Sequence, residues 1–144
     1  MIVEKEVFVD GEYRVGRYTV VILRRSGDNW YPAMMHLDAV ITNYRLMLRP
    51  FRKKYEPATL PSSYISRIEI SKRGMHHCVS LQLATEHELN LMLSTGHIED
   101  LASDLRLMKI PRRSHYDFDD SIARRDIQRL ISFFGKEPLL DTSA

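Results

Sequence analysis

Apolar and polar residues alternate along most of the N-terminal two thirds of the chain, a pattern typical of half-buried β-strands. In the clearest run, Val79, Leu81 and Leu83 lie on one face and the residues between them on the other. Alternation of this kind, or a short apolar run rich in β-branched residues as at 18–23, predicts strands at residues 7–9, 18–23, 31–42, 45–51, 65–70, 79–84 and 89–93. Asp10-Gly11 predicts a tight hairpin after the first of them. We therefore expect about seven strands.

From residue 98 onward the spacing of apolar residues becomes helical. It predicts a first helix over residues 98–108, with Ser94 or Thr95 as N-cap and Pro111 ending it. A second helix is expected from about residue 119 to Gly135. Its apolar stripe is Ile122, Ala123, Ile127, Leu130, Ile131 and Phe134. Strands first and helices last favour an α+β domain or a β-barrel with a helical plug over βαβ units.

Residues 37–48 resemble the signature of GRAM domains and related pleckstrin-homology-like domains. The corner Thr42-Asn43-Tyr44-Arg45-Leu46 joins two strands as in that family, and residues 60–69 resemble the element that follows it. The resemblance covers roughly residues 18–108. It implies a mainly β, seven-stranded antiparallel, partly open barrel of two near-orthogonal sheets, closed at one end by a helix. In such a fold Arg45 could pair with Glu69 across the sheet.

This fold leads to a division of the chain into three parts. Residues 1–110 are expected to form the PH/GRAM-like β-barrel with its capping helix. Residues 111–135 are expected to form a linker and an amphipathic C-terminal helix packed on the same domain, and residues 136–144 a loose tail. We favour the first helix as the plug because it directly follows the last strand.

The composition is that of an ordinary globular domain, with 44% hydrophobic and 28% charged residues among 144. Cys78 is the only cysteine, which favours a reducing compartment. The N-terminus lacks the pattern of a signal peptide, and no apolar stretch reaches the length of a membrane-spanning helix. We therefore expect a cytoplasmic protein, with peripheral attachment to a membrane as an option.

Basic residues concentrate between residues 43 and 73, although the whole chain carries a net charge of only +2. A mild overall charge argues against a nucleic-acid partner. The sharpest candidate for binding an anionic ligand, such as a lipid head group, is a set of basic loops. Its members are Arg24, Arg25, Arg49, Arg52, Lys53 and Lys54. The usual phosphoinositide motif of pleckstrin-homology domains is missing, and a solvated basic loop is the alternative.

Apolar residues in two places are candidates for contact with a protein partner. Trp30 and Tyr31 lie at the end of a predicted loop, although aromatic residues more often fill cores. Ile127, Leu130 and Phe134 lie on the last predicted helix. That helix is expected to pack on the domain, and the alternative is an interface with a partner or a homodimer.

The sequence offers no candidate for catalysis, and we expect neither a metal nor another cofactor. His76, His77 and Cys78 are adjacent, but neighbouring strand residues point to opposite faces and cannot all bind one ion. Cys78 is expected to be a buried apolar residue. No nucleophile elbow, P-loop or dinucleotide motif is present.

Three functions remain, and the first is favoured. It is a non-catalytic protein-interaction module that binds a segment at an open strand edge. The alternative is a module that binds anionic lipid at a membrane surface through its basic loops. A small-molecule-binding or catalytic barrel is a weaker third, which would require a deep polar pocket.

Overall fold

The structure is a computed structural model that describes residues 8–51, 57–94, 96–108 and 124–129. Its strands are β1 (Arg14–Ser26), β2 (Asn29–Thr42), β3 (Arg45–Pro50), β4 (Ala58–Pro61), β5 (Ile65–Arg73), β6 (His76–Leu83) and β7 (Glu88–Leu93). A 3-10 turn, η1 (Ser62–Tyr64), precedes β5, and one α-helix, α1 (Ile98–Arg106), follows β7. A further helical turn lies at residues 124–129.

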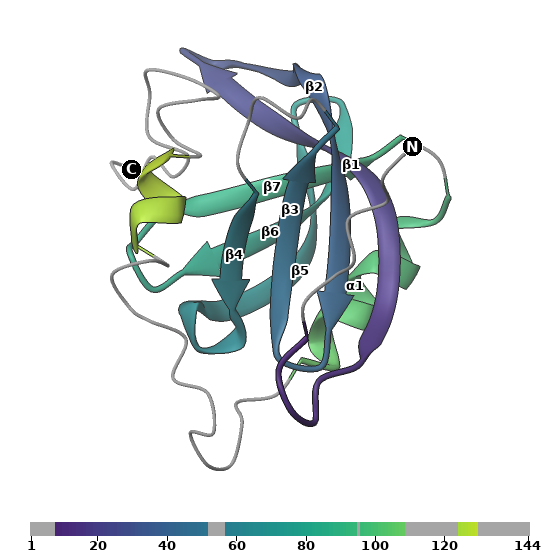
Figure 1. Ribbon diagram of the computed structural model, residues 1–144. Helices are drawn as coiled ribbons and strands as arrows, with labels where there is room; N and C mark the ends of the chain where they lie inside the picture. Colours follow the sequence, from purple (N-terminus) through teal and green to yellow (C-terminus); the bar gives the residue numbers. More distant parts are fainter. Residues whose placement is uncertain (1–7, 52–56, 95, 109–123, 130–144) are drawn as a thin grey trace.

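All seven strands belong to one antiparallel sheet in the order β4-β3-β2-β1-β7-β6-β5. Figure 1 shows β2, β3 and β4 in a front layer, with β5, β6 and β7 crossing behind them. The two end strands, β4 and β5, do not pair with each other, so the sheet is not closed into a barrel. The expected mainly β, seven-stranded antiparallel fold with an open side is confirmed.

Strand β1 joins the two layers because it is long and bends. It pairs with β2 along most of its length and with β7 through Val20, Val21 and Ile22. Its pairing with β2 shifts between Arg14 and Gly16 and again between Val21 and Leu23. Such irregularities bend a strand and increase its twist. The bent strand lets one sheet supply both layers around the core.

The core lies between the layers and is closed by α1 (Figure 1). The alternating side chains of β6 and β7, such as Val79, Leu81 and Leu91, are fully buried. Helix α1 adds Leu101, Ala102 and Leu105, which are also fully buried in the same cluster. Helix α1, which directly follows the last strand, therefore contributes to closing the core.

The strand count was right, but two of the elements were not. Phe8 and Val9 are not in a strand. The Asp10-Gly11 turn exists, with Glu12 N–H donating to the Val9 carbonyl at 3.0 Å, but it precedes the first strand. Conversely, β4 lies where a long connection was expected. With four residues, this strand is too short to show an alternating pattern.

The two C-terminal helices also differ from expectation. Helix α1 begins at Ile98 after His97, which makes no side-chain cap, so Ser94 is not its N-cap; Thr95 lies outside the described residues. Of the second predicted helix only residues 124–129 are described. Ile127 on this turn is fully buried and belongs to the core cluster.

Candidate functional site

The β5 end of the sheet has an exposed edge. The two-residue turn Gly74-Met75 joins β5 to β6, with Gly74 at φ +60°, so Arg73 and His76 form the hydrogen-bonded pair that closes it. Antiparallel pairs then alternate, which turns the backbone groups of every second residue away from β6. The outward-facing residues are Ile68, Ile70 and Lys72.

Few of these outward groups have a partner. The Arg106 guanidinium of α1 donates to the Ile68 carbonyl at 3.3 Å. No residue in the described part of the chain bonds the outward N–H or carbonyl of Ile70 or Lys72. The Ile70 side chain is also 43% exposed, which is high for an isoleucine on a face that contacts the core. The edge is therefore accessible to another extended segment.

A pocket lies beside β5 near each end of α1. One of about 220 Å³ is lined by Ile65, Ser66, Arg67, Ile68 and the C-terminal end of α1. The other, of about 380 Å³, is lined by residues of β5, β6, β7, α1 and the loop before α1. They are Ile70, His77, Leu93, Gly96, His97, Ile98 and Glu99. Both pockets combine apolar walls with charged or titratable rims, as side-chain subsites of peptide-binding grooves do.

The opposite edge, at β4, is covered. The outward N–H of Thr59 donates to the Asp126 carboxylate at 2.9 Å. The Arg129 guanidinium donates to the carbonyl of Pro57 and lies 3.0 Å from Asp126. Ile127, between them, is buried in the core. The turn at residues 124–129 therefore caps β4 with both backbone contacts and apolar packing.

The basic residues proposed as one anionic site are separated. Arg24 pairs with Tyr31 of β2 and Arg49 with Asp38 of β2, seven residues further along that strand, or roughly 20 Å. Arg25 donates to the Gly27 carbonyl at 2.9 Å. The structure thus does not bring Arg49 together with Arg24 and Arg25. Arg52, Lys53 and Lys54 lie outside the described residues.

Arg49 takes part in an ion network instead. Arg17 donates to both carboxylate oxygens of Asp38, at 2.9 and 2.8 Å, and Arg49 to one of them at 2.9 Å. Burial would raise the pKa of Asp38, but the hydrogen bonds from Arg17 and Arg49 outweigh it, and the pKa lies below its usual value. This network joins β1, β2 and β3 and has a structural role.

The Thr42–Arg45 corner forms hydrogen bonds and an ion pair within the fold. Arg45 grips the Glu12 carboxylate with two bonds of 2.9 Å, and Thr42 donates to it at 2.6 Å. Asn43 bonds the backbone of Gly11 and Tyr13 through its side chain. The corner therefore holds the segment before β1 in place. The suggested Arg45–Glu69 pair does not form, because Arg45 is bound to Glu12 and Glu69 lies 2.5 Å from Arg67.

Trp30 and Tyr31 lie where two hairpin tips meet. The Arg73 guanidinium stands over the Trp30 ring at 5.9 Å, and that of Arg24 over the Tyr31 ring at 5.4 Å. Tyr31 is 38% exposed and Met75, on the neighbouring tip, 82% exposed. This end of the molecule is consequently an exposed surface that mixes aromatic and basic side chains.

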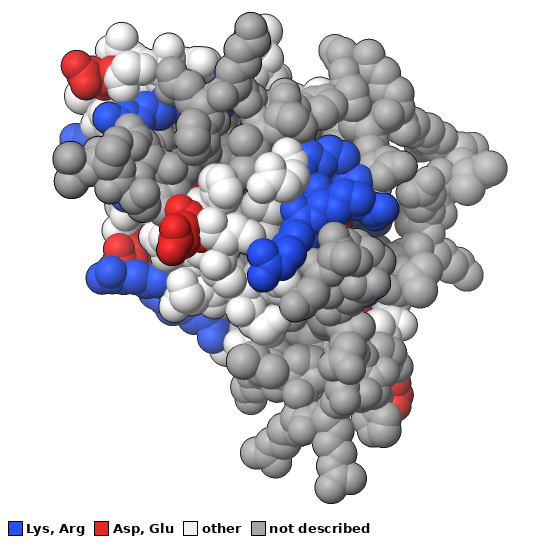
Figure 2. All heavy atoms as spheres, turned by 90° about the vertical axis from the view of Figure 1, so that its left-hand side faces the viewer, with Lys and Arg blue, Asp and Glu red and all other residues white. Residues whose placement is uncertain are grey.

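The last predicted helix does not offer Ile127 to a partner, because that side chain is buried in the core. Leu130 and Phe134 lie outside the described residues. Arg124 and Arg125 on the same turn are exposed. Figure 2 views this side of the molecule and shows Lys and Arg side chains gathered in a patch. The described turn therefore presents charge, and not apolar surface, to solvent.

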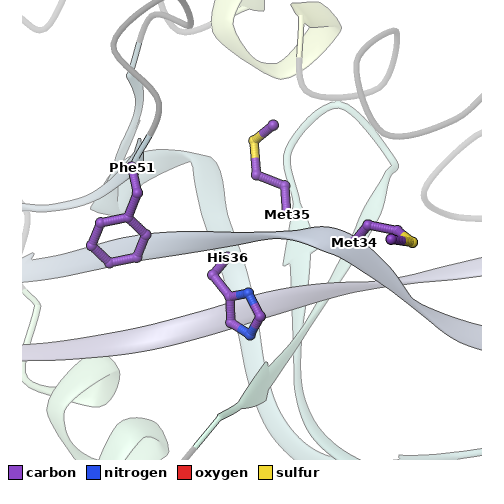
Figure 3. Close-up of a pocket in the computed structure, with 4 residues that line it drawn as sticks. All are labelled: Met34, Met35, His36 and Phe51. Atoms are coloured by element: carbon purple, nitrogen blue, oxygen red, sulfur yellow. The ribbon is translucent and has the colours of Figure 1, made fainter.

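Another pocket, of about 400 Å³, lies beside β2 and the end of β3, where it is lined by Met34, Met35, His36 and Phe51. Figure 3 shows Met35 and His36 pointing to opposite sides of β2. Met34 is 97% and Phe51 59% exposed. Among these four residues His36 is the one titratable group, and the other three offer apolar contact.

The Cys78 thiol is fully buried, as expected. Burial raises its pKa, which keeps the thiol protonated and poorly nucleophilic. Its neighbour Ser80 donates to Asn90 at 2.5 Å. Within the described ranges, no three His, Cys, Asp or Glu side chains are placed to hold a metal ion.

No protein-family model matches this chain. A search of curated proteins also found no match. Within the described residues, no helix has the length and apolar character needed to cross a membrane.

Sequence reasoning anticipated an open edge but not which one. The isoleucines at 65, 68 and 70 marked β5 as a strand. Its place at the end of the sheet follows from long-range pairing of β1 with β7. No local signal in the sequence reports that pairing.

Proposed function

We propose that this chain is a non-catalytic binding module of the GRAM or pleckstrin-homology-like type, which binds an extended segment of a protein along the edge of β5. The observation that carries the proposal is the pair of unpartnered backbone positions, Ile70 and Lys72, between two side-chain pockets. A peptide strand would bond these groups and place alternate side chains toward α1.

The two pockets favour a peptide with apolar residues at alternate positions. The pocket near the C-terminal end of α1 carries Arg67 and Arg106, so an acidic residue suits that end. The larger pocket offers Ile70, Leu93 and Ile98 for an apolar side chain. The resemblance of residues 37–48 to GRAM domains and the seven-stranded sheet followed by a helix are consistent with a binding module of this kind.

Proline at position 70 tests the proposal. Peptides selected from a random library on the intact chain are titrated against wild type, Ile70→Pro and Ile70→Val. Proline removes the outward N–H, which does not bond β6, and edge strands tolerate such a residue. We expect Ile70→Pro to weaken binding about tenfold or more, the value of a lost backbone hydrogen bond plus local distortion.

The control is Ile70→Val, which retains the N–H and most of the side chain and should bind within about twofold of wild type. Both variants are checked for folding by circular dichroism. Equal binding by a folded Ile70→Pro variant would rule out strand addition at β5.

Binding to an anionic membrane surface is the second candidate. The observation in its favour is the pair of hairpin tips, where Arg24, Tyr31, Trp30, Arg73 and exposed Met75 lie together. Aromatic and basic side chains of this kind suit the interface of anionic bilayers. Sedimentation with phosphatidylserine vesicles should fall for Arg24→Ala/Met75→Ser and not for Arg67→Ala. No dependence on lipid charge would exclude it.

A further inference from the structure

The β5 edge has a symmetry that points to a particular occupant. We propose that a second copy of this chain pairs its β5 antiparallel with the first, about a twofold axis at Ser71. This inference rests on the proposed function, since it uses the same edge. The two copies would form one continuous sheet, with Ile70 of each bonded to Lys72 of the other.

This register uses the backbone groups that are free. Ile70 and Lys72 are the outward-facing residues whose N–H and carbonyl have no partner in the described part of the chain. With Ser71 on the axis, each copy contributes both, and two complete hydrogen-bonded pairs form. On the other face Glu69 of one copy lies opposite Arg73 of the other, twice, and opposite charges in such pairs are favourable. Arg73 also donates to Glu88 of its own chain at 2.7 Å, so Glu69 of the second copy would join an existing ion pair.

Neighbouring registers are worse. A twofold axis at Glu69 sets two carboxylates side by side. An axis at Ile70 sets Arg67 opposite Arg73, and like charges directly opposite each other are destabilising. An axis at Ile68 requires a carbonyl that already accepts a bond from α1.

The larger pocket supports the same register. Lys72 of the second copy lies opposite Ile70, within about 5 Å between Cβ atoms. Ile70 lines the 380 Å³ pocket whose rim carries Glu99. The apolar stem of the lysine can pack on Ile70 while its ammonium approaches the Glu99 carboxylate. Lys72 and Glu99 are both exposed in the single chain, so they are available for this contact.

Self-pairing and peptide binding exclude each other, because both need the backbone of Ile70 and Lys72. The interface is short, so the dimer should be weak and depend on concentration. A peptide that occupies the edge should dissociate it. The module would therefore bind its peptide most readily when dilute.

Disulfide trapping tests the register. In a Cys78→Ala background, Ser71→Cys places two thiols across the axis at a non-hydrogen-bonded pair, where Cα atoms are about 4.5 Å apart. We expect mild oxidation to give a covalent dimer in most of the protein. Glu69→Cys is the matched control, because its two copies would be roughly 13 Å apart along the strands. Trapping of Glu69→Cys as readily as Ser71→Cys would overturn the register.

Charge exchange gives a second test with the cysteine left in place. Sedimentation velocity should show Lys72→Glu and Glu99→Lys each dimerising several-fold more weakly than wild type. An equal mixture of the two variants restores opposite charges at both contacts and should recover the dimer. Failure of the mixture to recover it would contradict the pairing of Lys72 with Glu99.

The outcomes separate the two proposals. Self-pairing is overturned if the wild-type chain stays monomeric and the Ser71→Cys variant is not trapped. The proposed function still stands in that case if the wild-type chain binds peptide and Ile70→Pro weakens the binding. Trapped dimers without peptide binding would support self-pairing alone.

Discussion

The two end strands of the sheet differ in how their outward backbone groups are treated. At β4, an Asp126 carboxylate that is nearly buried accepts from Thr59, and buried Ile127 anchors the turn that carries it. At β5, a strand more than twice as long, one carbonyl receives one 3.3 Å bond from an exposed arginine. An exposed strand edge invites pairing, and proteins generally cover it. The chain caps one edge with its own C-terminal turn and leaves the longer edge open, and our proposal of a partner at β5 rests on this contrast.

The carboxylates that form ion pairs also differ in exposure between the β4 side and the β5 side. On the β4 side, the carboxylates of Glu12 and Asp38 are 0% and 8% exposed and each binds arginine. On the β5 side, Arg67 and Glu69 are 70% and 46% exposed. Exposed pairs contribute little to stability, about 0–1 kcal/mol. Arg73 of β5, however, bonds Glu88 at 2.7 Å with both side chains at most 30% exposed, so the contrast holds for the Arg67–Glu69 pair and not for every charge on this side.

Among the variants that test the difference between β4 and β5, Ile127→Ala should have the largest effect on stability. Truncation removes a fully buried side chain from the core cluster and should lower the free energy of unfolding by about 2–4 kcal/mol. Urea denaturation measures it. Arg125→Ala, on the same turn but exposed, is the control and should change stability by less than about 0.5 kcal/mol. A loss below about 0.5 kcal/mol for Ile127→Ala would mean that the turn does not cap β4.

Asp126→Ala should have the next largest effect. It leaves the Thr59 N–H without its acceptor and Arg129 without its carboxylate, at a cost of about 1–3 kcal/mol. Hydrogen exchange gives a direct readout, because the Thr59 amide should exchange slowly in wild type and quickly in the variant. The amides of Ile70 and Lys72 should exchange quickly in both. Slow exchange at Ile70 in the isolated, dilute chain would show that the β5 edge is also covered.

The elements that sequence predicted well are those whose signal is local. The alternation of β6 and β7 and the helical spacing of α1 report burial directly, so the bounds of these elements were predicted to within three residues. Asp10-Gly11 did predict a turn. The neighbouring Phe8 and Val9 nevertheless form no strand, and Glu12 after the turn binds Arg45, 33 positions away. Strand β4 was missed since its four residues owe their conformation to β3.

The candidate site could not be predicted from local sequence patterns. The basic residues looked like one site because they share a charge, but strand register decides which of them meet. Arg24 and Arg49 lie opposite distant positions of β2, and Arg49 is bound to Asp38. The residues that we propose as the site, Ile70 and Lys72, are distinguished by the direction of their backbone groups. That direction depends on the β5–β6 turn and on the place of β5 in the sheet.

Acid titration tests how far the ion pairs of Asp38 stabilise the fold. Because the pKa of Asp38 is lowered in the folded protein, its stabilising effect is complete above the unfolded value of about 4 and is lost as pH falls through the folded value. Asp38→Asn should therefore be less stable than wild type by about 1 kcal/mol at neutral pH. The difference should shrink toward zero in strong acid. Urea denaturation across this range measures it, and a difference that does not change with pH would contradict the role given to Arg17 and Arg49.

Arg106→Ala should have the smallest effect and gives the sharpest comparison with Asp126. Arg106 is exposed and donates one long bond to the Ile68 carbonyl, so its loss should change the free energy of unfolding by less than about 0.5 kcal/mol. Peptide affinity at the β5 edge should not fall when the selected peptide lacks an acidic residue, because no edge group is lost. A stability loss above about 1 kcal/mol, comparable to that of Asp126→Ala, would show that α1 closes β5 as firmly as the C-terminal turn closes β4. The β5 edge would then be closed by the chain itself, and a partner at that edge would no longer be expected.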